Sequence, residues 1–369
     1  MTTLFSPIDV RAVTFPNRIG VSPMCMYSAG PDGVATQWHT VHLGSRAVGG
    51  AGLVFTEATA VTAEGRITDG DLGIWNDTQR EALRPITDFI RQAGAVPGIQ
   101  LSHAGRKGGR QIPWEGYEPI PQAEWGALPA PSPVAFREGW STPVEMSAAD
   151  IESVIESFVS AARRAVQAGF GVIELHFAHG YLLHQFLSPL TNLREDEYGG
   201  PLANRARLAV AIAEAVRAEV GPGMPLFARL SVVDWVDGGL TLEESVEIST
   251  LLRRAGVDVI DCSSGAVVDG EKVPAGPLYQ VEFSSRIRKE AEVLTAAVGL
   301  IQDGSDAEGV LTRQDADFIL LGRAFLQDAY WPRRAARELI GHEAEPRIPL
   351  PYRRAVERMS APKSTPSQW

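Results

Sequence analysis

Cysteine is nearly absent from this sequence. Only Cys25 and Cys262 occur among its 369 residues, and they do not form a CxxC pair. Two isolated cysteines cannot make a disulfide framework, and they are too few to hold a structural zinc ion or an iron–sulfur cluster. We therefore expect Cys25, where it acts, to act as a free thiol.

Basic charge and long apolar runs are also lacking. The formal net charge is -11, and no block of consecutive basic residues offsets it. Such a chain repels phosphate backbones and anionic lipids, so neither nucleic acid nor membrane is an expected partner. A membrane-spanning helix needs about 18 consecutive apolar residues, and no apolar run in the sequence is that long. A signal peptide needs an unbroken apolar segment near the N-terminus, and Asp9, Arg11 and Arg18 interrupt that region. The sequence predicts a cytoplasmic protein.

The chain does contain a regular alternation of short apolar runs and longer helical segments, from about residue 18 to residue 330. Each run is almost continuously apolar, which is typical of parallel strands buried on both faces. The eight expected strands are RIGVSPM (18–24), GLVFTEA (52–58), VPGIQLS (96–102), GVIELHF (171–177), PLFARLS (225–231), VDVIDCS (257–263), LTAAVG (294–299) and DFILLG (317–322). Amphipathic segments such as residues 148–169, which ends at Gly169, are expected to be helices. Eight β-then-α units predict an α/β fold, a (β/α)8 TIM barrel, as a single domain over residues 1–369.

Two segments depart from this alternation. Residues 104–147, after the third strand, are rich in Pro, Gly and Trp without a clear period, so we expect a lid insertion over the strand ends. The tail after residue 331 is rich in proline and carries the basic stretch YRRAVER. A doubly wound sheet is the alternative fold. It would require a GxGxxG turn after the first strand, and the GFG at 169–171 lacks the third glycine.

Polar residues collect where the expected strands end, which is where a TIM barrel carries its functional groups. They are Ser22 to Tyr27, Glu57, Ala58, Gln100, His103, His176, His179, Arg229, Ser263 to Gly265, Gly299, Gly322 and Arg323. Gly322 and Arg323 precede a helix, where free backbone N–H groups and an arginine suit a phosphate. A plain loop with a solvated arginine is the alternative for this pair.

The two histidines of HFAHGY allow three interpretations. His176 and His179 could bind zinc with Asp234 or Glu57, although no ligand motif surrounds them, so no metal is expected. They could be satisfied core residues. Alternatively, two neutral imidazoles in a polar cavity could donate to one oxygen atom, with Tyr181 delivering a proton.

Eight ordered motifs resemble the Old Yellow Enzyme family of FMN-dependent ene-reductases, in particular its thermophilic-like bacterial branch, which carries a Cys near the flavin. They are SPMCMYSA, TEATAV, GIQLSHAGRK, HFAHGYLLHQFLSP, DEYGG, DVIDCSSG, AAVGLI and DFILLGRAFLQDAYWP, over about residues 4–358. The resemblance implies non-covalent FMN, NADPH or NADH as reductant, and enones, enals or maleimides as acceptors. It implies hydride transfer from flavin N5 and protonation by Tyr181.

The resemblance also implies a role for each matching residue. Cofactor contacts are expected from Ser22, Pro23, Met24, Cys25, Ala58, Gln100, His176, Arg229, Gly299, Gly322 and Arg323. Arg229 would face the flavin's N1 side, and Cys25 would tune its potential. Substrate contacts are expected from Tyr27, His176, His179, Tyr181 and Arg358. Arg358 would come from the neighbouring subunit of a homodimer or homotetramer, with Arg354 or Trp369 as alternatives.

Two other functions are compatible with the same residues. A flavin-binding protein without turnover could use Cys25 as a redox sensor, and a lyase or hydrolase could use the histidines without flavin. A relative of the dienoyl-CoA reductases is excluded, because two cysteines cannot hold its iron–sulfur cluster.

Overall fold

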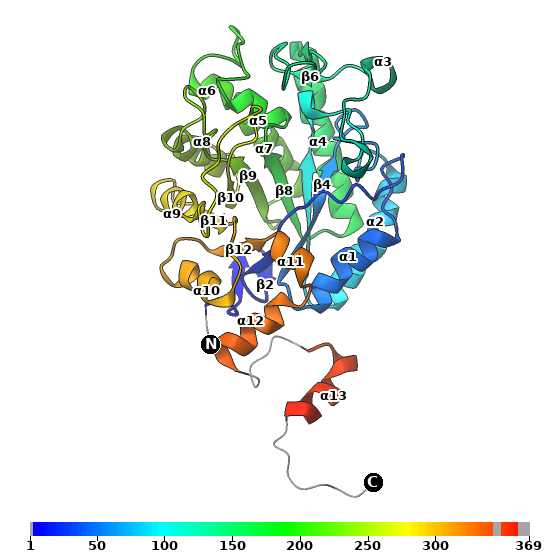
Figure 1. Cartoon of the computed structure of the whole chain (residues 1–369), viewed down its shortest axis with the longest axis vertical. Helices are drawn as coiled ribbons and strands as arrows, with labels where there is room; N and C mark the ends of the chain where they lie inside the picture. The colour runs from blue at the N-terminus through cyan, green and yellow to red at the C-terminus, as the bar shows by residue number, and fades with distance from the viewer. Residues whose placement is uncertain (1–2, 342–347, 361–369) are drawn as a thin grey trace, which may run out of the picture.

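Eight parallel strands form a closed barrel at the centre of the molecule (Figure 1). They are β3 (Ile19–Val21), β4 (Leu53–Ala60), β5 (Val96–Ser102), β8 (Val172–Phe177), β9 (Leu226–Ser231), β10 (Val259–Ser263), β11 (Leu294–Ala297) and β12 (Phe318–Leu321). The computed structural model describes residues 3–341 and 348–360, with side chains up to residue 355. The strands follow one another in chain order, and β12 closes the barrel against β3, with Ile319 opposite Ile19. Each strand overlaps one of the eight expected runs, so the predicted TIM barrel is confirmed.

Helices connect the strands and cover the outside of the barrel (Figure 1). The longer ones are α1 (Gln37–Val48), α2 (Asp77–Gln92), α4 (Ala148–Ala168), α7 (Arg207–Val220), α8 (Leu242–Arg254), α9 (Val281–Glu290) and α10 (Gly304–Thr312). Short helices α5 (Leu182–Leu187) and α6 (Leu202–Arg205) follow β8. The short helix α11 (Arg323–Gln327) and the longer α12 (Trp331–Ile340) follow β12. None of the described helices is long and apolar enough to cross a membrane.

Helix α4 shows how local sequence sets the ends of these helices. The Ser147 side chain accepts a hydrogen bond from the N–H of Asp150, whose carboxylate reaches back to the Ser147 N–H. This reciprocal capping box satisfies amide groups that a helix start leaves unpaired. The helix ends at Gly169, which adopts φ +90° in the left-handed region. The helix predicted for residues 148–169 is confirmed, including its glycine end.

Phenylalanines seal the amino-terminal end of the barrel. The hairpin of β1 (Ile8–Val10) and β2 (Val13–Phe15) brings Phe15 to a ring-centroid distance of 5.1 Å from Phe318. Phe55 and Phe227, early in their strands, lie 5.8 Å apart in the same cluster. Because this end is filled by apolar rings, polar groups and ligands are confined to the opposite, carboxyl end of the strands.

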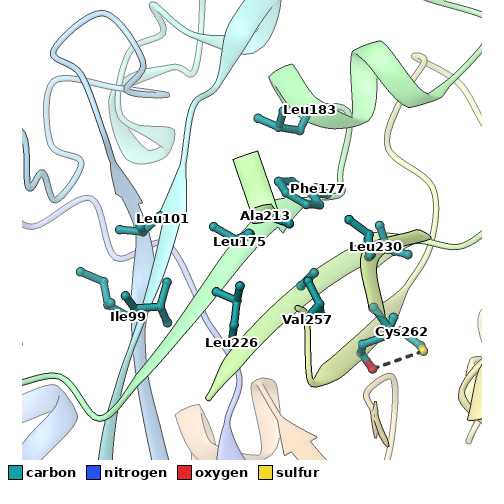
Figure 2. Close-up of a cluster of buried hydrophobic side chains, with 14 of the residues drawn as sticks. Ile99, Leu101, Leu175, Phe177, Leu183, Ala213, Leu226, Leu230, Val257 and Cys262 are labelled. Atoms are coloured by element: carbon teal, nitrogen blue, oxygen red, sulfur yellow. Dashed lines mark hydrogen bonds between the residues drawn. The ribbon is translucent and has the colours of Figure 1, made fainter. Parts of the chain in front are cut away.

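A second apolar layer joins the strands to the surrounding helices. Figure 2 shows Ile99, Leu101, Leu175, Leu226 and Leu230 on the strands, with Ala213 of α7 in the same cluster. Cys262 lies in this layer and is fully buried, with its Sγ 3.6 Å from the Ile260 carbonyl oxygen. The sulfur therefore serves as a small apolar group.

The insertion after β5 contains only short elements. They are the 3₁₀ turns η1 (Gly105–Lys107) and η2 (Pro113–Glu115), helix α3 (Gln122–Trp125), and the paired strands β6 (Pro129–Ala130) and β7 (Val144–Glu145). Its first residues are attached to the loops after β8 and β10. Lys107 donates to the carbonyls of His179 and Ala266, and Arg106 donates to Val267. The insertion is therefore held against the ends of these strands, where the sequence predicted a lid.

Candidate active site

A cavity of about 650 Å³ lies at the carboxyl ends of β3, β9, β11 and β12. Seven residues predicted to contact a cofactor line it: Ser22, Pro23, Met24, Arg229, Gly299, Gly322 and Arg323. Other lining residues were not selected from the sequence, among them Leu300, Ile301, Gln302, Ala324, Gln327, Asp328, Trp331 and Arg334. They follow the same two strands in sequence, so the position of the predicted phosphate loops was the available signal.

The loop after β11 requires glycine. Gly299 has φ +115°, and a Cβ there would come within 2.6 Å of Gln280 Nε2. That amide donates to the Val298 carbonyl at 2.9 Å, and Gln280 Oε1 accepts from Ser264. A larger residue would displace this bracing contact. After β12, helix α11 begins at Arg323 and has only five residues, so the arginine supplies more of the positive charge than the helix dipole does.

Arg229 connects this cavity to a polar layer inside the barrel. Its Nη1 donates to Ser22 Oγ at 3.0 Å, and its Nε lies 3.2 Å from Asp261 Oδ2. On the neighbouring strands, Gln100 Nε2 donates to Glu174 Oε1 at 2.7 Å. Burial raises the pKa of Asp261 to about 6 against the opposing effect of Arg229, and burial with the nearby Asp261 raises that of Glu174. The layer therefore holds one cation and two acids that resist ionisation.

Sequence reasoning did not select Glu174 and Asp261 because neither lies at a strand end. Both interrupt apolar runs, VIELHF and VDVIDCS, and an acidic residue inside such a run was the signal that could have identified them.

The two histidines face each other beside Arg229. Strand register places His176 opposite Arg229, and His179 follows in a turn with φ +59°. His176 Nε2 lies 3.3 Å from His179 Nδ1, and His179 Nε2 lies 2.8 Å from Ser263 Oγ. Burial, and then the charge of Arg229, lowers the pKa of both imidazoles well below its usual value. The two neutral rings thus hold His176 Nε2 and His179 Nδ1 next to each other, and an oxygen atom placed at this pair would accept from both in place of their mutual contact.

Tyr181 completes this group. Its ring centroid lies 5.2 Å from that of His176, and Lys107 Nζ lies 5.2 Å from its centre. Burial raises the pKa of Tyr181 well above its usual value, so the hydroxyl keeps its proton. The turn before it is fixed by His184, which accepts from Gly180 N at 2.8 Å and contacts Asp234 Oδ1 at 2.9 Å.

The zinc interpretation receives no support from the geometry. Asp234 is bonded to His184, and Glu57 lies 3.1 Å from His39, so each candidate third ligand is engaged elsewhere. Among the described residues, no three His, Cys, Asp or Glu side chains form a group able to hold a metal ion.

Cys25 lies in the loop after β3, half-buried, next to buried acids. Glu57 Oε2 accepts from Met26 N at 2.9 Å, and Asp71 Oδ2 accepts from Ile67 N at 2.7 Å. Burial, followed by the charges of Asp71 and Glu57, raises the pKa of the Cys25 thiol well above its usual value. The side chain is thus held as a thiol.

The remaining predicted residues lie in two places. Ala58 and Gln100 are buried partners on β4 and β5 and do not line the cavity. Arg354 is exposed on α13 (Leu350–Ser360), which Figure 1 shows beyond α12 and away from the barrel. The side chain of Arg358, and Trp369, lie outside the described residues.

These residues fit a flavin nucleotide. Glycine and arginine at the ends of β11 and β12 suit a phosphate. The buried atom His176 Nδ1 has no hydrogen-bond partner among the described residues, as expected of a group that faces a polar ligand.

Both the sequence and the fold match known proteins. Residues 3–341 match the NADH:flavin oxidoreductase / NADH oxidase family. The chain is 48% identical over 339 residues to an NADPH dehydrogenase of Geobacillus sp. (strain WCH70), covering 92% of this chain and 95% of the relative. An Old Yellow Enzyme homologue from Zymomonas mobilis has a TM-score of 0.77 at 28% identity, over 92% of this chain and 94% of that one. Morphinone reductase has a TM-score of 0.77 at 26% identity, over 94% and 92%. The chain therefore belongs to the NADH:flavin oxidoreductase / NADH oxidase family, and its resemblance to Old Yellow Enzymes is confirmed.

Proposed function

We propose that this flavin-dependent oxidoreductase reduces the activated C=C bond of α,β-unsaturated carbonyl compounds such as enones, enals and maleimides. The observation that carries the proposal is the 3.3 Å approach of His176 Nε2 and His179 Nδ1, next to Tyr181 and beside the cavity that Arg229 lines. Two such donors stabilise the negative charge that develops on the carbonyl oxygen during hydride addition, and an acid supplies the proton that the α-carbon takes up.

FMN is the proposed cofactor, with NADPH or NADH as its reductant. Ser22, Pro23, Met24 and Ala58 would lie along the ring, Gln100 and Arg229 at its polar edge, and Gly299, Gly322 and Arg323 at the phosphate. A bound FMN would supply hydride chemistry, from the nicotinamide to the β-carbon of the acceptor. The 48% identity to an NADPH dehydrogenase supports this assignment.

The protein's own groups hold the acceptor and supply the proton. His176 and His179 donate to its carbonyl oxygen, which draws electron density from the alkene. Their lowered pKa keeps both rings neutral at pH 7, so each offers one N–H without the cost of burying a cation. Tyr181 then donates its proton to the α-carbon, and Tyr27 lies against the substrate.

A redox sensor based on Cys25 is the second candidate, and the environment of the thiol argues against it. Oxidation by peroxide proceeds through the thiolate. Burial and two nearby acids raise the pKa of Cys25, so little thiolate forms at pH 7. Cys25 is better suited to tuning the potential of an adjacent flavin.

The visible spectrum of the purified protein tests the proposal. A yellow protein should bleach when NADPH is added without oxygen and recover its colour when cyclohexenone is added. A colourless protein that takes up no FMN would overturn the cofactor assignment, and a protein that bleaches without recovering would overturn the acceptor class. His176→Ala should retain FMN and lose about 10²–10³ in turnover of the enone.

We also propose that the protein is a cytoplasmic homodimer or homotetramer whose α13 segment contributes Arg358 to a neighbouring active site. The exposure of Leu350 (74%) and Tyr352 (43%) on α13 supports this, because such side chains are normally covered in an assembly.

A further inference from the structure

Arg110 differs in its hydrogen bonds from the other buried arginines among the described residues. The buried arginines are Arg106, Arg110, Arg194, Arg205, Arg229 and Arg333. The other five each donate from a terminal nitrogen to a carbonyl, carboxylate or hydroxyl oxygen. Arg110 donates only through Nε, to the Lys107 carbonyl at 3.0 Å, and its buried Nη2 has no partner. Only 2% of the residue is exposed, and Nη2 is buried, so water does not compensate this nitrogen.

The position of Arg110 is firmly held. Its N–H donates to the Ile67 carbonyl at 2.9 Å, and its backbone bridges both Thr68 and Pro119. The guanidinium carbon lies 4.4 Å from the ring centre of Tyr117 and 4.3 Å from that of Trp140. These rings stabilise the positive charge but accept none of its in-plane N–H groups. The side chain is therefore pre-organised, with donors still to be satisfied.

The neighbours of Arg110 are phenols and cations. Among the described residues, no carboxylate is a main contributor to the electrostatic environment of Arg110. Burial lowers the pKa of Arg110, the hydroxyls of Tyr117, Tyr181 and Tyr27 oppose this, and Arg137 adds to it. Lys107, whose carbonyl accepts from Arg110 Nε, has its own Nζ 5.2 Å from the ring centre of Tyr181. This contact, together with the electrostatic influence of Tyr27 and Tyr181 on Arg110, puts Arg110 near the two tyrosines proposed to face the substrate.

We propose that Arg110 binds an anionic oxygen group, a carboxylate or a phosphate, on a ligand that lies beside Tyr27 and Tyr181. A planar guanidinium can give such a group two parallel hydrogen bonds. This inference rests on the proposed function, because the ligand occupies the same site. Two ligands carry the required chemistry: an acceptor with a carboxylate remote from its alkene, and the phosphates of the nicotinamide nucleotide.

Matched ligands distinguish these sources. The first pair is a linear enone with a terminal carboxylate, separated from the alkene by two methylenes, and its methyl ester. The second pair is NADPH and N-benzyl dihydronicotinamide, which has no phosphate, followed in the reductive half-reaction by stopped flow. Two ratios of kcat/KM are measured, that of the acid to its ester and that of NADPH to N-benzyl dihydronicotinamide. They are compared among the natural chain, Arg110→Met, which removes the charge, and Arg110→Lys, which keeps it. Calorimetric binding of the saturated carboxylate gives a readout independent of turnover.

Arg137→Met is the control. Arg137 belongs to the same lid and stacks on Trp140 at 4.7 Å, but it pairs with Asp269 at 3.6 Å and 44% of its side chain is exposed. Its loss should leave both ratios unchanged.

We expect Arg110→Met to lower one ratio by about 10- to 100-fold, the effect of a lost charged hydrogen bond, with partial rescue in Arg110→Lys. A fall in the acid-to-ester ratio identifies the acceptor as the source, and a fall in the NADPH ratio identifies the nucleotide. Unchanged ratios in a folded, FMN-loaded variant would overturn the inference and leave Arg110 as a structural contact of the lid. If Arg110→Met does not fold, the natural chain still tests the inference. Equal kcat/KM for the acid and its ester, and for NADPH and N-benzyl dihydronicotinamide, would overturn the inference. A natural chain that reduces no enone at all would instead refute the proposed function.

Discussion

Burial sets the protonation state of each residue on which the proposed chemistry depends. It lowers the pKa of His176 and His179 and raises that of Tyr181. In each case the neutral form is favoured, since a charged group loses more solvation on burial than a neutral one does. The same effect prepares two hydrogen-bond donors and one acid for neutral pH.

Replacement of Tyr181 by Phe should separate the two halves of the reaction. We expect reduction by NADPH to continue and reduction of the enone to slow by about 10²–10⁴, because the positioned acid is lost. Stopped-flow spectroscopy measures both steps. In the natural chain the histidines and Tyr181 should not titrate between about pH 6 and pH 9, because the lowered histidine pKa and the raised tyrosine pKa both lie outside that window. Burial lowers the pKa of Lys107, beside Tyr181, to about 7, so any pH dependence of the enone step in this window is expected from Lys107. An equal loss in both half-reactions would contradict the role given to Tyr181.

Alkylation of Cys25 should be slow at pH 8 and should accelerate only at strongly alkaline pH. The thiol pKa is raised by burial, then by Asp71 and Glu57, so thiolate appears late as the pH rises. Asp71→Asn removes one of these charges and should shift the profile of iodoacetamide labelling to lower pH. Rapid labelling of the natural chain at pH 7 would instead favour the redox sensor. Cys262 is fully buried and should react little. The variant Cys25→Ser, in which only Cys262 remains, measures how much of the labelling comes from Cys262.

At the scale of elements, α2 and α4 are each followed by a glycine in the left-handed region. Gly94 after α2 and Gly169 after α4 have nearly the same φ, +91° and +90°. Their surroundings differ, because a Cβ at Gly94 would meet nothing within 4 Å, whereas one at Gly169 would meet Arg91 and Thr87. Arg91 Nη2 also donates to the Gly169 carbonyl at 2.9 Å, which joins α2 to α4.

The two glycines allow strain and packing to be measured separately. Gly94→Ala should lower the free energy of unfolding by about 1–2 kcal/mol, the cost of a left-handed L-residue. Gly169→Ala should cost more, because the new methyl group displaces Arg91 from its carbonyl contact. Urea denaturation of both variants, with Arg91→Ala as a third, gives the comparison. Equal losses at the two glycines would show that the Arg91 contact contributes nothing measurable.

At the scale of the whole molecule, the two ends of the barrel have opposite character. Phe15, Phe55, Phe227 and Phe318 fill the amino-terminal end. Arginines and glycines line the cavity at the carboxyl end, His176 lies opposite Arg229 on the neighbouring strand, and the lid insertion is attached to the loops after β8 and β10. The cavity residues all precede residue 341, where the family match ends.

A chain that ends at residue 350 should therefore fold and retain FMN. If α13 completes a neighbouring site through Arg358, this truncation should raise KM for an enone about tenfold, the effect of one lost charged hydrogen bond, and should reduce the oligomer. Light scattering and steady-state kinetics measure the two effects. Full affinity in the truncated chain would count against the proposed contribution of the tail.

Much of the architecture was determined by local sequence. Continuous apolar runs identified all eight strands, since a strand buried on both faces has no polar side to display. The capping residues Ser147 and Gly169 bounded α4, because caps depend on chemistry within a few residues. Strand-end position also selected the seven predicted residues that line the cavity.

Only the tertiary structure decided which distant groups meet. The 2.8 Å contact of His179 with Ser263, the bonding of Asp234 to His184, and the buried layer of Glu174 and Asp261 each join different strands or loops. The unsatisfied guanidinium of Arg110 depends likewise on rings supplied by separate turns of the lid. Sequence periodicity indicates whether a residue is buried. The pKa of a buried group and its hydrogen bonds depend on which groups surround it. Closure of the barrel brings those groups together from distant parts of the chain.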